Sequence, residues 1–251
     1  MNRRGQSGFL AVATAVALVL LIPLMAVVLA PISPACFEYC NLGQSFATIG
    51  VAVVGLAWMA TTISVAWLRE PDLTPFSLLV ACGLLIAATL LFAWTEPLRP
   101  IRDLFPLILV MALGLQLPPL WRLAAESPHR RLARMASWVA GGAVGLGSLG
   151  LLFGGVGPLS GAYAIVGVAF IVFLAALAAV ALVAIVVMPT SKSGAIGIIA
   201  AGALIPFVSL AFRAIGVDAG QLVILTPVLL VVGWLWIGLI WWRGGVDAEP
   251  A

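Results

Sequence analysis

The hydrophobic pattern divides the chain into eight long apolar segments joined by shorter polar stretches. None of the eight contains Asp, Glu, Lys, Arg or His. They span residues 8–30, 46–68, 76–95, 104–121, 137–157, 160–188, 194–212 and 221–242. A helix crosses the hydrocarbon core with about 20 apolar residues. Apolar and polar residues do not alternate as in barrel strands, so the segments are predicted to be helices.

Composition supports lipid as the surrounding solvent. Of the 251 residues, 64% are hydrophobic and 8% are charged, whereas a soluble domain carries about 25% charged residues. We therefore predict an all-α integral membrane protein, an eight-transmembrane-helix bundle. Its expected partner is the lipid bilayer.

Two segments leave alternatives open. Segment 137–157 holds eight glycines, each of which costs a soluble helix about 1 kcal/mol relative to alanine. Without this span, seven helices would remain and the C-terminus would lie outside. Segment 8–30 follows Arg3 and Arg4 and could be a cleaved signal peptide, but its 23 residues exceed the usual apolar region of about 7–15. A retained span is the favoured interpretation.

The basic residues predict the orientation, because cytoplasmic loops are enriched in Lys and Arg. With the N-terminus inside, nine basic residues fall on the cytoplasmic side and three fall outside. The nine are Arg3, Arg4, Arg69, Arg122, Arg130, Arg131, Arg134, Lys192 and Arg243, and the three are Arg99, Arg102 and Arg213. Both termini are predicted to be cytoplasmic, in a cell membrane. The net charge of +3 then reflects topology and does not indicate nucleic-acid binding.

The chain carries signs of an internal repeat. Arg3-Arg4 matches Arg130-Arg131 at an offset of 127 residues, and Pro31 matches Pro158 at the same offset. An offset of 121 pairs Leu104, Pro106, Trp121 and Arg122 with Leu225, Pro227, Trp242 and Arg243. We predict two parallel four-helix repeats, residues 1–122 and 123–251, a pattern that occurs among transporters.

The two repeats differ in the outer loop 31–45, which contains Cys36 and Cys40. Such a pair can form a disulfide if the Cα atoms lie roughly 4.4–6.8 Å apart, and a structural disulfide is the favoured interpretation. Free or modified thiols and a redox pair are the alternatives. Structural zinc usually takes four ligands, and the single histidine, His129, falls on the opposite side. We therefore expect no metal and no cofactor.

Few polar side chains lie within the spans, and Gln116, Thr61 and Thr62 are candidate ligand-binding residues. Gln116 precedes Pro118-Pro119, where a helix break would free carbonyl groups and could line a cavity. The alternative is that such side chains bond back to their own helix or join neighbouring helices.

Charged residues of the predicted outer loops form a second candidate site. They are Glu96, Arg99, Arg102, Asp103, Arg213 and Asp218. They could form the mouth of an outward-facing binding site. The alternative is ordinary solvated loop charge.

The predicted cytoplasmic loop 122–136 joins the two repeats. It contains His129, a solvated residue in our interpretation, followed by Arg130, Arg131 and Arg134. These turns are expected to lie on the inner leaflet, where each basic residue near anionic lipid contributes about 1 kcal/mol. The alternative is a docking site for a cytoplasmic partner such as an ATPase.

The charge-free spans argue against an ion-coupled transporter or a proton pump, because these proteins use intramembrane ionisable groups. Together with the parallel repeat, they favour a non-enzymatic membrane component. We predict a permease-like subunit or a small transporter for a neutral or apolar solute. One alternative is a scaffold subunit of a larger membrane complex. Another is a lipid-acting enzyme at the outer interface, using Glu96, Asp103 and Asp218. No residue is assigned a catalytic role, and the sequence leaves the oligomeric state open.

Overall fold

The structure is a computed structural model that describes residues 3–29, 37–68, 74–93, 104–127, 129–154, 162–185 and 190–246. Over these ranges the chain is helical, with short turns and no strand. The helices are α1 (Arg3–Leu29), α2 (Phe37–Leu68), α3 (Thr74–Ala93), α5 (Phe105–Leu115), α6 (Leu117–Glu126), α7 (Arg130–Gly154), α8 (Ala162–Ile185), α9 (Thr190–Ala214), the 3-10 helix η3 (Gly220–Ile224) and α10 (Leu225–Val246).

The helices confirm a polytopic, all-α membrane protein. Six helical segments are long and apolar enough to cross a bilayer: Phe46–Val65, Phe105–Glu126, Arg130–Phe153, Tyr163–Ile185, Lys192–Ala214 and Gly220–Trp241. Two more apolar helical segments are shorter over the residues that the structure describes: Val12–Met25 and Phe76–Leu90. Each predicted span therefore falls in helical structure, with 104–121 divided between α5 and α6. Six of the eight meet the length of a full crossing.

Helix boundaries differ from the sequence prediction at two polar stretches. Helix α2 begins at Phe37, so residues 37–45 form helical turns where the pattern predicts a loop. A helix can continue beyond the roughly 20 residues of a crossing and carry polar side chains outside the hydrocarbon. The predicted loop 122–136 is also largely helical, because α6 ends at Glu126 and α7 begins at Arg130.

Helices α5 and α6 form the centre of the bundle. They contact α2, α3, α7 and α8, and 78% of an apolar 18-residue stretch within Phe105–Glu126 is buried. Leu113, Leu115 and Leu120 are fully enclosed there. The central position explains why α5 is apolar all round, as a helix buried on every side must be.

The glycine-rich segment 137–157 falls largely within α7, one of the six candidate spans. A Cβ atom on Gly147 would lie 3.0 Å from Val110 Cγ2 of α5, and one on Gly150 would lie 2.7 Å from Ile165 Cγ2 of α8. Small residues allow such close approach between membrane helices. Packing against two neighbours therefore offsets the low helix propensity of glycine.

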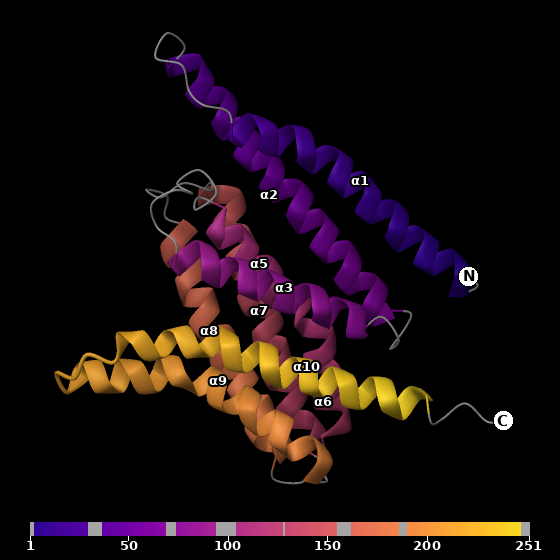
Figure 1. Cartoon of the computed structure of the whole chain (residues 1–251), viewed down its shortest axis with the longest axis vertical. Helices are drawn as coiled ribbons and strands as arrows, with labels where there is room; N and C mark the ends of the chain where they lie inside the picture. The colour runs from indigo at the N-terminus through magenta and orange to yellow at the C-terminus, as the bar shows by residue number, and fades with distance from the viewer. Residues whose placement is uncertain are drawn as a thin grey trace.

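Helices α9 and α10 lie side by side and are joined by a turn that projects from the bundle (Figure 1). Gly216 has φ +83°, the left-handed conformation that favours glycine after a helix. The Val217 N–H donates to Phe212 O at 3.0 Å and the Gly216 N–H donates to Arg213 O at 3.1 Å. This pair of bonds is the Schellman motif, and it ends α9 before the polar turn.

Helices α1 and α2 form a second side-by-side pair (Figure 1). The Trp58 Nε1–H of α2 donates to Thr14 Oγ1 of α1 at 3.1 Å. Most described side chains of α1 are exposed, among them Val12, Val19 and Ile22. This apolar face fits contact with lipid, which solvates such side chains as well as a protein core does.

Candidate functional site

The junction between α5 and α6 is built around Gln116. Pro118 and Pro119 follow it, and proline has no N–H with which to continue the helical bonding. Proline is, however, favoured at the first turn of a new helix, and α6 starts at Leu117. Gln116 keeps right-handed helical dihedrals (φ −82°, ψ −12°), and its N–H donates to Leu113 O at 3.1 Å. The interruption is therefore a single tight turn.

The Gln116 side chain is fully buried and uses both ends of its amide. Its Nε2 donates to Ala112 O at 3.2 Å, the carbonyl that would accept from the Gln116 N–H in an unbroken α-helix. Its Oε1 accepts from the Trp234 Nε1–H of α10 at 2.9 Å. The side chain therefore repairs the helix break and joins α10 to the centre of the bundle.

This geometry supports the interpretation of Gln116 as a tie between helices. Trp234 is itself fully buried, and a buried indole N–H requires an acceptor. An unpaired amide or indole in the interior would cost on the order of 1–3 kcal/mol. Each group thus satisfies the other where no water is expected.

Thr61 and Thr62 bond back to their own helix. The Thr61 Oγ1–H donates to Ala57 O at 2.8 Å and the Thr62 Oγ1–H donates to Trp58 O at 2.9 Å. Such bonds to the preceding turn are common for hydroxyl side chains in helices. Within the described interactions, no hydrogen bond joins either threonine to Gln116, so the structure does not assemble these three candidates into one polar site.

Only two of the predicted outer charges are described. Arg213 and Asp218 are exposed at the α9–α10 turn, where Asp218 Oδ1 accepts from the Gly220 N–H at 3.1 Å. The other members of this set, Glu96, Arg99, Arg102 and Asp103, lie outside the described residues, as does Cys36. Cys40 lies in α2, but its side chain is not described. The outer site and the disulfide therefore stay predictions.

The opposite end of the bundle holds a cluster that joins α6, α9 and α10. Lys192 Nζ lies 2.7 Å from Glu126 Oε2, and Arg122 Nε lies 3.4 Å from Glu126 Oε1. The Arg122 guanidinium also stacks over the Trp241 ring, 4.5 Å from its centroid. The end of α6, the start of α9 and the end of α10 therefore meet. If successive spans cross the bilayer in alternate directions, these three helix ends lie on the same side of the membrane.

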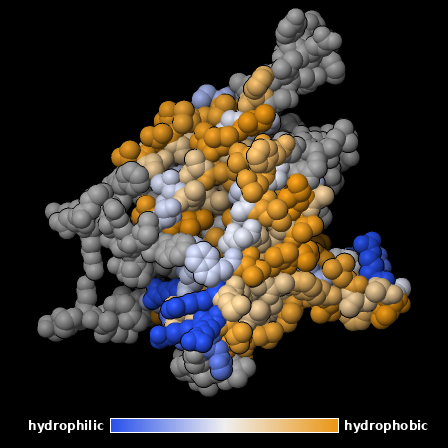
Figure 2. Space-filling view, turned by 180° about the vertical axis from the view of Figure 1, so that it is seen from behind, coloured by the Kyte–Doolittle hydropathy of each residue, from blue (hydrophilic) through white to orange (hydrophobic). Residues whose placement is uncertain are grey.

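Hydrophilic side chains gather at two separated places on the surface, with a broad apolar region between them (Figure 2). One place lies over the end of α6 and the start of α7. Five basic residues and one acidic residue are described there: Arg122, Arg130, Arg131, Arg134 and Lys192, with Glu126. The other is the α9–α10 turn, which carries Arg213 and Asp218. Polar ends around an apolar belt are the expected surface of a bilayer-spanning bundle.

The described side chains do not converge on a metal site. Across the described ranges, no three His, Cys, Asp or Glu side chains group closely enough to hold a metal ion. Comparison with family models, curated proteins and solved structures found no match to this chain. The site geometry alone must therefore carry a functional proposal.

Sequence reasoning did not identify the partners of Gln116 and Arg122. Trp234 stands in the interior of its span, away from the ends where tryptophan marks the interface. A tryptophan at that depth needs an acceptor. The predicted spans contain two amide side chains, Gln116 and Gln221, and Gln221 is the first residue of its span. Glu126 could have been linked to Arg122 by their spacing of four residues.

Proposed function

We propose that this protein is an integral subunit that supports a larger membrane complex. The observation that carries the proposal is the fully buried Gln116, with its amide bonded to Ala112 and Trp234. A permeation pathway through the centre would place such a group against the solute. Here it fixes the central helix to α10, so the centre of the bundle functions as a rigid packing core.

Exposed apolar faces supply the surfaces that such a subunit needs. On α7, the exposed fractions of Phe153 and Leu149 are 88% and 52%. On α10, Trp236 is 47% exposed. Membrane helices associate through van der Waals packing and small residues, without a hydrophobic driving force. Faces of this kind can therefore contact either lipid or a neighbouring subunit.

The proposal includes eight spans, cytoplasmic termini in a cell membrane, and two four-helix repeats. Helices α1 and α7 begin at Arg3 and Arg130, the arginines that the repeat aligns. The meeting of α6, α9 and α10 at Glu126 supports the alternation of the last four spans. The excess of basic residues at that end supports its cytoplasmic orientation.

Native mass spectrometry after gentle extraction from the native membrane tests the proposed function. We expect a stoichiometric partner chain that is lost in harsh detergent. An unrelated multi-pass protein extracted from the same membrane controls for carried-over neighbours. A lone chain or a homodimer that retains a defined neutral solute would contradict the scaffold proposal and favour a transporter. A retained lipid substrate that is converted would favour an enzyme.

Labelling with a membrane-impermeant maleimide tests the topology and the proposed disulfide together. The Cys82→Ser variant removes the third cysteine, which is buried in α3. We expect Cys36 and Cys40 to react from outside only after reduction. Reaction without reductant would contradict the disulfide. Labelling only after the membrane is opened would contradict the orientation.

A further inference from the structure

The first three turns of α7 have one buried side and one broad exposed side. Ala133, Ser137 and Ala140 face the core, and the Ser137 hydroxyl donates to Ala133 O at 2.8 Å. The exposed side carries four large apolar side chains. They are Leu132, Met135, Trp138 and Val139, exposed by 60%, 66%, 61% and 52%.

The exposed side is divided into a basic and an apolar sector. At about 100° per residue, Arg130, Arg134 and Arg131 fall on one part of the helix circumference. Met135, Val139 and Leu132 fall on the adjoining part, and Trp138 lies within the basic sector. All three arginines are exposed. Basic and apolar residues arranged in this way are typical of a helix at a membrane interface.

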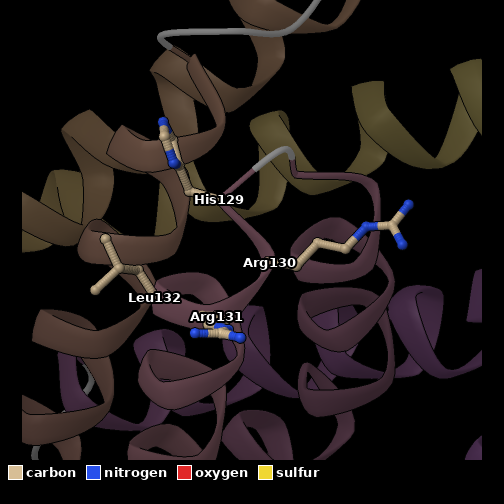
Figure 3. A pocket seen from close by; sticks show the side chains of 4 residues that line it. All are labelled: His129, Arg130, Arg131 and Leu132. Atoms are coloured by element: carbon tan, nitrogen blue, oxygen red, sulfur yellow. The ribbon is translucent and has the colours of Figure 1, made fainter.

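A hollow of about 310 Å³ opens at the start of this helix, lined by His129, Arg130, Arg131 and Leu132. The four side chains spread in different directions around the first turn (Figure 3), so the hollow is open to the surroundings. Small-molecule sites usually measure about 300–1,000 Å³. The hollow is therefore large enough for a small polar headgroup and is bordered by an apolar side chain.

Charge at this end favours an anion. Glu126, the single acidic residue described here, is already paired with Lys192 and Arg122. Among the described ion pairs, none involves Arg130, Arg131 or Arg134. Four more acidic residues belong to the same predicted side and lie outside the described residues: Glu70, Asp72, Asp247 and Glu249. Arginine presents a planar set of donors that matches the oxygens of phosphate.

We propose that this hollow binds the phosphate headgroup of an anionic membrane lipid. Arg130 and Arg131 bind the phosphate oxygens, and Arg134 adds positive charge one turn further along α7. Leu132 and Met135 lie beside the headgroup and its glycerol, and the acyl chains continue along Val139 as α7 enters the bilayer. Trp138 lies at the boundary between headgroups and hydrocarbon, where tryptophan is enriched. The inference is independent of the scaffold function, because it concerns lipid rather than a protein partner.

Competition between two lipids in native mass spectrometry tests the proposal. The full-length protein in neutral detergent is offered phosphatidylglycerol and phosphatidylcholine in equal amounts. We expect phosphatidylglycerol to be retained preferentially. The Arg130→Gln/Arg131→Gln variant should bind it about thirty-fold more weakly, because each basic residue at an anionic surface contributes about five-fold. The matched control is Arg213→Gln, at the opposite end, which should leave binding unchanged.

Several outcomes would overturn the proposal. They are equal retention of both lipids by the wild type, unchanged binding in the double variant, or an equal loss in Arg213→Gln. Displacement by glycerol 3-phosphate at the same concentration would assign the hollow to a soluble phosphate instead. If the double variant does not fold, wild-type binding from about 0.1 M to about 1 M salt decides, because the Debye length falls from about 10 Å to about 3 Å. Retention that is insensitive to salt would also overturn it.

Discussion

Helices α5–α6 and α10 carry the same pattern of Leu, Pro, Trp and Arg at an offset of 121 residues, yet they occupy different environments. Of an apolar 18-residue stretch within Phe105–Glu126, 78% of the residues are buried, whereas the corresponding share within Gly220–Trp241 is 33%. The first is broken before Pro118-Pro119, and the second continues as one helix to Val246. At the position of Gln116, α10 has the buried Ile237.

The comparison shows how one polar residue distinguishes two similar helices. A pair of prolines removes two backbone donors, and just before them the Gln116 N–H donates to Leu113 O instead of Ala112 O. The side-chain amide of Gln116 takes the place of that N–H at Ala112 O. The remaining amide oxygen then selects a partner, the indole of Trp234. In α10 the aligned positions are Leu239 and Ile240, which keep the helix continuous. A polar side chain at position 237 would therefore have no broken hydrogen bond to replace.

The packing between the two halves is also unequal. Helix α10 packs against α3 of the first half, whereas α9 packs mainly against α8, α10 and η3. A strict two-fold relation would place α9 against α5 in the same way. The described contacts therefore do not show an exact two-fold relation between the two predicted halves.

The largest effect is expected from removing the buried indole. Trp234→Ala should lower the free energy of unfolding in detergent by about 3–5 kcal/mol, because a large core side chain is lost and a cavity remains. Thermal or SDS-induced unfolding followed by circular dichroism measures the change.

Trp236→Ala is the matched control, two residues further along α10. Trp236 is 47% exposed, so its removal should change the unfolding free energy by no more than about 0.5 kcal/mol. Equal losses in the two variants would mean that α10 does not present Trp234 to the centre of the bundle.

A smaller effect is expected from the hydrogen bond itself. Gln116→Leu and Trp234→Phe should each destabilise the protein by about 1–3 kcal/mol, because each leaves a buried partner unsatisfied. The double variant should be less destabilised than the sum, with a coupling energy of about 0.6–1.7 kcal/mol, the range found between membrane helices. A double-mutant cycle in the same unfolding assay measures this coupling. Strict additivity would show that the two side chains do not interact.

The smallest effect is expected at the polar end where α6, α9 and α10 meet. Glu126→Gln removes the charge that pairs with Arg122 and Lys192, all three of which are about a quarter to a third exposed. Partly exposed ion pairs contribute about 0.2–1 kcal/mol, so stability should fall by that amount at low salt and less at high salt. Arg213→Gln at the other end should have no effect. A loss above about 2 kcal/mol would place Glu126 in a far less solvated environment.

The sequence predicted the helical segments well, because continuous apolar runs leave a chain in lipid few alternatives to helix. Even the glycine-rich α7 follows the prediction, although the close packing of its glycines on Val110 and Ile165 depends on tertiary structure that the local sequence does not reveal. Helix ends were harder to predict. Polar residues such as Glu38 and Asn41 signal the end of the hydrocarbon region, and a helix can continue past it, as α2 does.

The candidate site was predictable only in part. The position of Gln116 before two prolines identified it as unusual from sequence alone. Its role depends on Trp234, 118 residues away, and neither hydrophobic periodicity nor local spacing links residues at that separation. Thr61 and Thr62 are typical of the simpler case, since their bonds to Ala57 and Trp58 follow from local helix geometry.

The bond between Gln116 and Trp234 also has a consequence for biosynthesis. Because Trp234 is made 118 residues after Gln116, and ribosomes add about 5–20 residues per second, the central helix waits about 6–24 s for its partner. During that interval the Gln116 oxygen is in the membrane without its final donor. Chains that stall before α10 should therefore expose an unpaired Gln116 amide oxygen at the centre of an otherwise apolar bundle. Quality-control proteases could recognise such chains by this group.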